Sequence, residues 1–214
     1  MKEVVRGWIQ RRIIDLGTHY VLAGGDQLTD LGKINFQRFK DNIKSGQATP
    51  FSEYIGVLDG FNHSLDGLNV LESLKGKNAF FLENHTADGP IRNGHWKLFA
   101  TSYVVKDKTG KEIRWTYGQN KSTIQELFRK PVAERINAIP IREKNGTQGV
   151  RDIIKALDSK DSVGLFPEGN CDKKLIRGNP KAGGLILYVA KKNIPIVAIA
   201  AWFEAKTWHL SFAI

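Results

Sequence analysis

The sequence lacks the features that mark exported and membrane-spanning proteins. One cysteine, Cys171, stands among its 214 residues, so no internal disulfide can form, and this fits a reducing, cytoplasmic compartment. The longest apolar run, Ile194–Phe203, has ten residues, about half of what a membrane-spanning helix requires. Arg11 and Arg12 interrupt the stretch that would have to be the apolar part of a secretory signal. We therefore expect a cytoplasmic chain without a membrane-spanning segment.

Patterns typical of metal, nucleotide and nucleic-acid binding are missing as well. His19, His95 and His209 are scattered without the spacing of metal ligands, so the sequence predicts no zinc site. The glycines around residues 178–184 lack the Gly-Lys-Ser/Thr ending of a nucleotide-binding loop. There is no zinc-finger spacing, no RNA-binding aromatic motif and no basic stripe interleaved with aromatics. These absences argue against a kinase and against nucleic acid as a partner.

Positive charge, in contrast, is in excess. The formal net charge is +10 at pH 7 and the pI is about 9.7, and such a surface concentrates anionic partners by long-range attraction. Since the nucleic-acid motifs are missing, we expect the anionic partners to be a membrane surface and phosphorylated substrates. Hydrophobic residues make up 41% of the chain and no low-complexity block interrupts it, which predicts a single domain folded throughout.

The first 75 residues have the periodicity of helices. Apolar residues recur at three- and four-residue steps near the N-terminus, which predicts an amphipathic helix. We favour a helix packed on the domain, and the alternative is a membrane-surface anchor with Trp8 at the interface. Further helices are expected over Asp30–Ser45 and Leu65–Leu74. The apolar face of the first helix consists of Val5, Trp8, Ile9, Ile13 and Leu16.

From residue 76 to residue 214, short apolar runs alternate with amphipathic stretches. This rhythm predicts an α/β core with a mixed β-sheet flanked by helices. The predicted strands are Ala79–Leu82, Ile136–Ile141, Val163–Phe166 and Ile194–Ala200, with a weaker one at Ile113–Tyr117. The predicted helices are Arg92–Val104, Gln148–Leu157 and Lys181–Lys192.

Two polar motifs follow directly after predicted strands, at the edge where α/β sheets usually bind ligands. The first is Glu83-Asn84-His85-Thr86-Ala87-Asp88-Gly89-Pro90, in which Asp88 is placed to hold the imidazole of His85. A histidine oriented by a carboxylate can take the proton of an alcohol as its oxygen attacks a carbonyl. The alternative is a turn histidine followed by an aspartate that caps the next helix.

A near copy of this motif lies upstream, at Asn62-His63-Ser64-Leu65-Asp66-Gly67. It follows no apolar strand and opens a stretch with helical periodicity, so we interpret Ser64 or Asp66 as a helix N-cap. The sequence therefore favours His85 over His63 as the base.

The second motif is Phe166-Pro167-Glu168-Gly169, a tight turn followed by a basic segment. Glu168 is placed to accept hydrogen bonds from the hydroxyls of a polyol, and lysine and arginine side chains suit a phosphate. The alternative is a solvated basic loop. Candidate phosphate contacts are Lys173, Lys174, Arg177 and Lys181 of that segment, together with Arg142 after the strand Ile136–Ile141.

Taken in order, these motifs resemble the glycerolipid acyltransferase superfamily, which includes the lysophosphatidic acid and glycerol-3-phosphate acyltransferases. The resemblance covers about residues 76–203. It depends on Asn84-His85-x-x-Asp88, Ile139-Pro140-Ile141-Arg142, Leu165-Phe166-Pro167-Glu168-Gly169, Lys181-Ala182-Gly183 and Ile194-Pro195-Ile196-Val197.

The resemblance implies that His85 and Asp88 form a dyad that deprotonates the hydroxyl of a phosphate-bearing glycerol or lysolipid acceptor. The acceptor would attack the thioester of acyl-CoA or acyl carrier protein, without a metal or other cofactor. Arg142 would contact the phosphate, and Glu168 with Gly169 would form the acceptor-binding turn. The protein would act in phospholipid biosynthesis, as a peripheral protein on the inner face of the membrane.

The sequence departs from that family at two places. The family usually has four residues between the histidine and the aspartate, whereas this chain has two. It also tends to follow Phe-Pro-Glu-Gly with a small hydroxyl residue and an arginine, where this chain has Asn170 and Cys171. Alternatives to the transferase therefore stay open: a member without turnover that binds lipid or a membrane surface, and a hydrolase that uses the same base on water.

Overall fold

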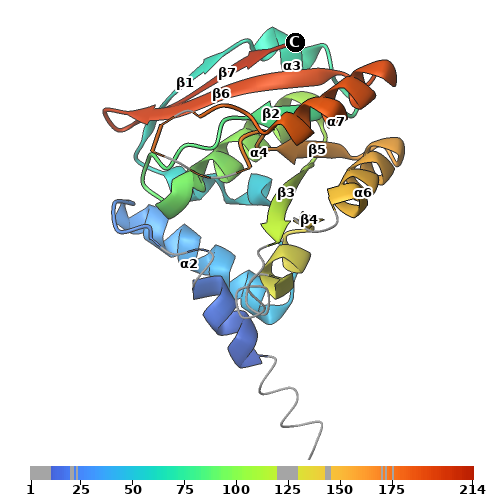
Figure 1. Ribbon diagram of the computed structural model, residues 1–214. Helices are drawn as coiled ribbons and strands as arrows, with labels where there is room; N and C mark the ends of the chain where they lie inside the picture. The colour runs from blue at the N-terminus through green and yellow to red at the C-terminus, as the bar shows by residue number, and fades with distance from the viewer. Residues whose placement is uncertain are drawn as a thin grey trace, which may run out of the picture.

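The computed structural model describes residues 11–19, 22, 24–119, 130–142, 146–169, 171, 173–174 and 176–214. Its centre is a seven-stranded mixed sheet with the strand order β1-β7-β6-β2-β5-β3-β4, and helices flank it (Figure 1). The predicted α/β class is therefore confirmed. The strands are β1 (Asn62–Asp66), β2 (Phe80–Glu83), β3 (Ile113–Gln119), β4 (Ile139–Arg142), β5 (Ser162–Leu165), β6 (Ile196–Glu204) and β7 (Thr207–Ala213).

Five of the strands run in the same direction. β6, β2, β5, β3 and β4 pair in parallel, so their carboxyl ends share one edge of the sheet. β7 turns back antiparallel to β6, and β1 then pairs in parallel with β7 at the far side. The two motifs after β2 and β5 thus start from adjacent positions on the same edge.

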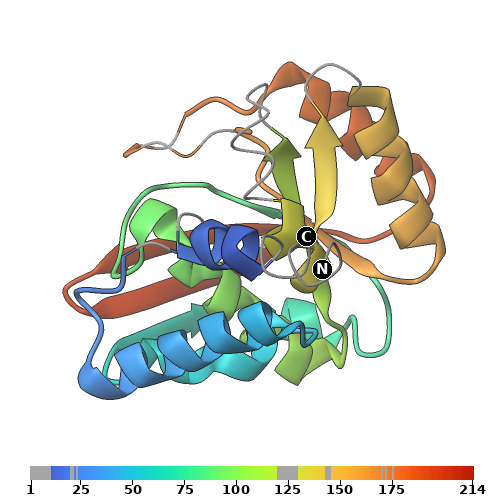
Figure 2. The same ribbon diagram turned by 90° about the horizontal axis from the view of Figure 1, so that it is seen from below.

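The helices form two groups that enclose two apolar clusters. One cluster lies among α2, η1, α3 and α4, and the other lies against α6 and α7. Figure 2 shows α6 and α7 on the opposite side of the strands from α2. The bounds are α2 (Asp30–Ser45), η1 (Phe51–Leu58), α3 (Leu68–Glu72), η2 (Arg92–Gly94), α4 (Trp96–Thr109), α6 (Gly146–Asp158) and α7 (Pro180–Lys191), and residues 11–19 and 130–135 are also helical.

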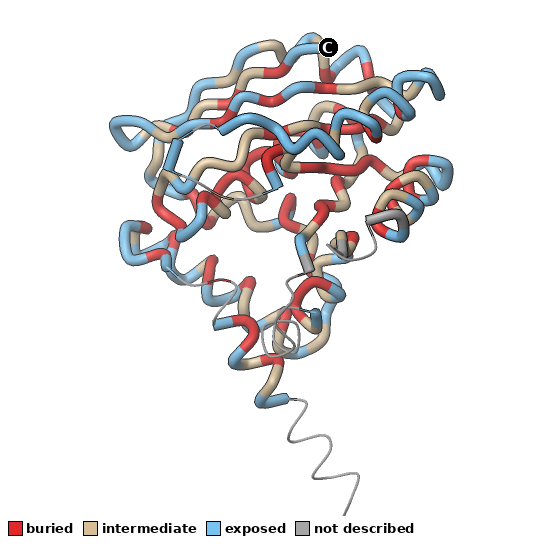
Figure 3. Tube along the Cα trace, in the orientation of Figure 1, coloured by how far each residue is buried: buried red, intermediate tan, exposed pale blue. Residues whose placement is uncertain are grey.

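The central strand β2 feeds both clusters because its side chains alternate between the two faces. Phe80 joins the cluster under α6 and α7, and Phe81 joins the cluster around α4. Glu83 follows Phe81 at the same period and therefore also faces α4, where it is completely buried. Figure 3 shows this buried centre of the sheet in red.

Several predicted elements are present with small shifts. The helix predicted over Asp30–Ser45 has the same bounds in the structure, where the Thr29 hydroxyl caps its start by accepting from the Gly32 N–H at 3.1 Å. The helices predicted over 92–104, 148–157 and 181–192 correspond to η2 with α4, to α6 and to α7. The strand predicted from residue 136 begins at Ile139, because the preceding helix ends in a turn in which the Ile136 N–H donates to the Val132 carbonyl.

The helical N-terminal region expected over residues 1–75 is present, and it also contains one strand that was not expected, β1. The upstream motif copy, Asn62–Asp66, is that strand, and neither Ser64 nor Asp66 is a helix N-cap. α3 begins two residues later with Gly67 as its cap, and no side chain caps it. The prediction failed because β7 was not recognised, although Trp208, Leu210 and Phe212 alternate with more polar residues and turn inward.

The predicted apolar face of the first helix is wrong at Leu16, whereas Ile13, its other described residue, is half-buried. Within residues 11–19, Ile14 and Thr18 are buried, while Leu16 is 56% exposed. Val5, Trp8 and Ile9 lie outside the described residues. This part of the helix is packed by the residues next to those expected. Among the described residues, no helix has the length and apolarity needed to cross a bilayer.

Candidate functional site

The two motifs meet at the carboxyl edge of the sheet. β2 and β5 are neighbours, with Phe80 opposite Val163 and Leu82 opposite Leu165. The ring of His85, just past β2, stacks on the ring of Phe166, just past β5, with centroids 4.3 Å apart and planes 23° from parallel. The convergence expected from the sequence is therefore present.

A third aromatic ring extends this stack into the interior. Trp115 of β3 also stacks on Phe166, with ring centroids 5.1 Å apart and planes 14° from parallel. Its indole N–H donates to the Ser102 hydroxyl of α4 at 2.9 Å, in a buried position. The imidazole of His85 thus packs on Phe166, which in turn packs on Trp115, and Trp115 is hydrogen-bonded to the buried Ser102.

The surroundings of His85 favour an uncharged imidazole. Nδ1 is buried and has no hydrogen-bond partner. Burial, and then the nearby ammonium of Lys97, lower the pKa of His85 to about 4, because both disfavour the imidazolium. At neutral pH the ring can therefore accept a proton.

Asp88 does not hold this ring, so the expected hydrogen bond between Asp88 and His85 is wrong. One carboxylate oxygen of Asp88 accepts from the Thr86 hydroxyl at 2.7 Å and from the ammonium of Lys97. The other accepts from the backbone N–H of Phe203, in β6, at 2.7 Å. With two residues between His85 and Asp88, the carboxylate turns toward α4 and β6 and away from the imidazole. The catalytic roles of both residues stay predictions.

The loop that carries His85 is fixed from several sides. Asn84 continues the pairing with β6: its amide donates to the Ala201 carbonyl at 2.8 Å, and its side-chain oxygen accepts from the Ala201 N–H at 2.6 Å. The indole N–H of Trp96 donates to the Asp88 carbonyl at 2.9 Å. Gly94, with φ of 66°, lies so close that a Cβ there would be 2.1 Å from the Thr86 carbonyl oxygen.

Behind the loop lies a buried cluster of ionisable side chains. Glu83 is 0% exposed, and its carboxylate oxygens make no hydrogen bond of regular geometry, although the buried Thr101 hydroxyl is close by. Burial raises the pKa of Glu83 to about 8, although the ammonium of Lys97, and then the Thr101 hydroxyl, offset part of the effect. Asp88 and Glu168 raise it further by like-charge repulsion, so Glu168 of the second motif lies within electrostatic reach of the first. Glu168 is 7% exposed and also has a buried oxygen, Oε2, without a partner.

The basic segment leaves the Phe-Pro-Glu-Gly turn and folds back onto it. The Asn179 N–H donates to the Pro167 carbonyl at 2.7 Å, and the Asn179 side chain then caps α7. The thiol of Cys171 donates to the Asn93 carbonyl at 3.4 Å, which ties this segment to the loop after β2. The four predicted cations Lys173, Lys174, Arg177 and Lys181 are all exposed.

Arg142 stands apart from His85. It ends β4, the edge strand, which is separated from β2 by β5 and β3. At about 4.8 Å per strand its backbone lies on the same edge but roughly 14 Å from β2. Its side chain is outside the described part of the structure. The structure thus brings together His85, Asp88 and Glu168, with the basic segment beside them, and leaves Arg142 farther along the edge.

Three residues of the site were missed by sequence reasoning: Glu83, Lys97 and Trp115. A signal existed for Lys97, because it shares a helical stripe with Ala100, Thr101 and Val104, which are all buried. A lysine on such a stripe requires an acidic partner inside the fold. For Trp115 no signal existed, since its contact with Phe166 depends on the order of β5 and β3 in the sheet.

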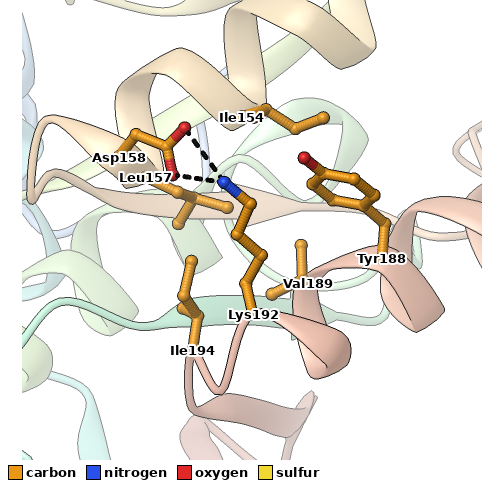
Figure 4. A pocket seen from close by; sticks show the side chains of 7 residues that line it. All are labelled: Ile154, Leu157, Asp158, Tyr188, Val189, Lys192 and Ile194. Atoms are coloured by element: carbon orange, nitrogen blue, oxygen red, sulfur yellow. Dashed lines mark hydrogen bonds and ion pairs between the residues drawn. The ribbon is translucent and has the colours of Figure 1, made fainter.

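One hollow lies elsewhere in the described part of the structure. A small hollow between α6 and α7 is lined by apolar side chains, and Lys192 pairs across it with Asp158 at 3.2 Å (Figure 4). It adjoins Ile194 and Asp158, which precede β6 and β5, so it lies at the opposite edge from His85. Among the described residues, no group of three or more histidine, cysteine, aspartate or glutamate side chains is placed to hold a metal ion.

Comparison with known proteins gives no family for this chain. Neither a protein-family model nor a curated protein sequence matches this chain.

Proposed function

We propose that the protein is an O-acyltransferase that moves a fatty-acyl group from a thioester donor to a hydroxyl of a phosphate-bearing glycerol or lysolipid. The observation that carries the proposal is the stack of His85 on Phe166, which joins an uncharged imidazole to the turn that contains Glu168. The order of the sequence motifs, which resembles the glycerolipid acyltransferases, supports the same conclusion.

The chemistry needs one base and no cofactor. Because Nδ1 of His85 is buried, Nε2 is the nitrogen that an acceptor hydroxyl would reach. Nε2 takes the hydroxyl proton as the oxygen attacks the thioester carbonyl. The new ester C–O bond forms, the C–S bond breaks, and the imidazolium returns the proton to the leaving thiolate.

The acceptor would be held by the second motif. Glu168 and Gly169 form the turn next to the imidazole, where a glutamate oxygen can accept from a polyol hydroxyl. Lys173, Lys174, Arg177 and Lys181 supply charge for the phosphate, and a role for Arg142, farther along the edge, stays a prediction. The same cations suit the anionic surface of a membrane, so we place the protein in the cytoplasm, peripheral to the inner face, in phospholipid biosynthesis.

A second candidate is a lipid-binding protein without turnover. The observation that favours it is the pairing of Asp88 with Lys97 and the Phe203 amide, which leaves His85 without a carboxylate. A base whose pKa is about 4 is also weaker than one near the working pH. This candidate predicts binding to anionic vesicles with no chemical product.

The test is an assay of acyl transfer from acyl-CoA and from acyl carrier protein to lysophosphatidic acid and glycerol 3-phosphate. His85→Ala should abolish transfer, because it removes the base. The matched control is His63→Ala, which changes the same residue in the near-identical motif of β1 and should keep wild-type activity. Full activity in His85→Ala would refute the base assignment. Free fatty acid formed without acceptor would indicate a hydrolase, and vesicle binding alone would favour the second candidate.

A further inference from the structure

Lys97 is a buried cation that the proposed reaction does not use. It lies in the first turn of α4 and is 0% exposed. Its ammonium donates to the Asp88 carboxylate and to the Thr86 carbonyl, the latter at 3.3 Å. It also lies 4.6 Å from the centroid of the neighbouring Trp96 ring. Within the described part of the structure, both hydrogen-bond acceptors of Lys97 belong to the loop that carries His85.

Burial of the Lys97 ammonium is energetically unfavourable unless other interactions offset it. Moving an ammonium out of water costs several kcal/mol, and an apolar side chain of the same length would fill the space without that cost. One carboxylate, that of Asp88, contacts Lys97 directly, whereas Glu83, whose pKa is raised to about 8, is mostly uncharged at neutral pH. The charge of Lys97 is therefore compensated, and the ion pair gives Asp88 a defined position.

That position connects three elements. Lys97 belongs to α4, Asp88 to the loop after β2, and the Phe203 N–H that donates to Asp88 belongs to β6. The Thr86 hydroxyl donates to the same carboxylate, so the backbone on both sides of residue 87 is held. His85 is the residue immediately before this clamp.

We propose that Lys97 is a positioning residue: by clamping Asp88 and the Thr86 carbonyl, it fixes the loop so that the His85 imidazole lies on Phe166, in place of a hydrogen bond from Asp88 to the ring. This inference rests on the proposed function for its catalytic consequence. The clamp itself can be measured whether or not the protein is an enzyme.

The first measurement is the coupling between the two charges. Lys97→Met and Asp88→Asn each leave a partly or fully buried charge without its partner, and each should raise the unfolding equilibrium constant on the order of 100-fold in urea titrations. The double variant removes both charges. Its fold-increase in the unfolding equilibrium constant should therefore be at least tenfold smaller than the product of the two single-variant increases. If Lys97→Met does not fold, a double variant that does fold supports the clamp. A double-variant increase that equals the product of the two single-variant increases within about twofold would overturn the clamp.

The matched control is Lys192→Met. Lys192 pairs with Asp158 at 3.2 Å, but both side chains are 40% or more exposed, so this ion pair should contribute little. Its removal should change the unfolding constant less than about threefold. A control effect as large as that of Lys97→Met would mean that burial is not what gives the clamp its strength.

The second measurement follows His85 directly, through the NMR titration of labelled imidazoles assigned with His85→Gln. Lys97→Met should move the titration midpoint of His85 to higher pH, because a cation near the ring is lost, and Lys192→Met should leave it in place. In the acyl-transfer assay, Lys97→Met should lower kcat at least tenfold with little change in KM for the acceptor.

The outcomes separate the two proposals. A wild-type protein without transfer activity refutes the proposed function, while charge coupling and a shifted titration would still support the clamp. An active wild type, combined with an unmoved His85 midpoint and unchanged kcat in Lys97→Met, would refute the clamp alone.

Discussion

Replacing Glu83 by glutamine should change how folding stability depends on pH. Glu83 is buried at the end of β2 and its pKa is raised to about 8, chiefly by loss of solvation. A carboxyl group with a raised folded pKa stabilises the fold fully below its unfolded pKa of 4.5. That stability is lost as the pH rises toward the folded pKa, because the unfolded chain releases its proton first.

The magnitude follows from linkage. One pH unit between the two pKa values is worth about 1.4 kcal/mol, so Glu83 should cost the wild type about 3 kcal/mol between about pH 5 and 7.5. Glutamine has nearly the same shape and no proton to lose. The stability of Glu83→Gln relative to the wild type should therefore increase by about 3 kcal/mol over this range.

The assay is urea denaturation of both proteins at about pH 5 and pH 7.5, followed by fluorescence. Glu204→Gln, the same change at an exposed position at the end of β6, is the control and should show no such pH-dependent gain. A difference between Glu83→Gln and wild type that is equal at the two pH values would refute the reasoning. It would mean that Glu83 is ionised in the folded protein and paired with Lys97.

Two further predictions concern the loop. The folded pKa of His85 is lowered to about 4 from 6.5, so its contribution to stability is present above pH 6.5 and is lost as the pH falls. The free energy of unfolding of His85→Gln, relative to wild type, should therefore increase by about 2 to 3 kcal/mol between about pH 6.5 and 4.5 in the same urea assay. Gly94→Ala would put a Cβ against the Thr86 carbonyl at a positive φ and should cost about 2 kcal/mol or more. Its control is Gly110→Ala, which also has a positive φ but nothing within 4 Å, and should cost about 1 kcal/mol; equal losses would refute the close approach as the cause.

The parts of the fold that follow from local sequence were predictable. Phe80-Phe81-Leu82 and Val163-Gly164-Leu165 are apolar runs of strand length, and each is followed by a polar motif. Once both were taken as parallel strands with their carboxyl ends on one edge, the approach of His85 to Phe166 followed from sheet geometry. The stack of the two rings confirms that reasoning.

The parts that depend on distant partners were not predictable. The aspartate of His-x-x-Asp was expected to bond to the histidine, and it bonds instead to Lys97 and to the Phe203 amide. The amide comes from a strand 115 residues away, and no local pattern announces it. Local spacing therefore indicated which residues gather at the site, but not which of them bond to each other.

The pairing of β1 with β7 also bears on the order in which the protein can assemble. Asp66 and Ser211, which share a hydrogen bond across this pairing, are 145 positions apart. β6 and β7 are joined by the two-residue turn Ala205-Lys206, both at positive φ, so this hairpin can form quickly and locally. β1 has to stay single until the hairpin is complete. During synthesis on the ribosome, Asn62–Asp66 therefore stays unpaired while the residues up to β7 are added. Because Leu65 is its one large apolar residue, this strand exposes little of the apolar surface that promotes aggregation.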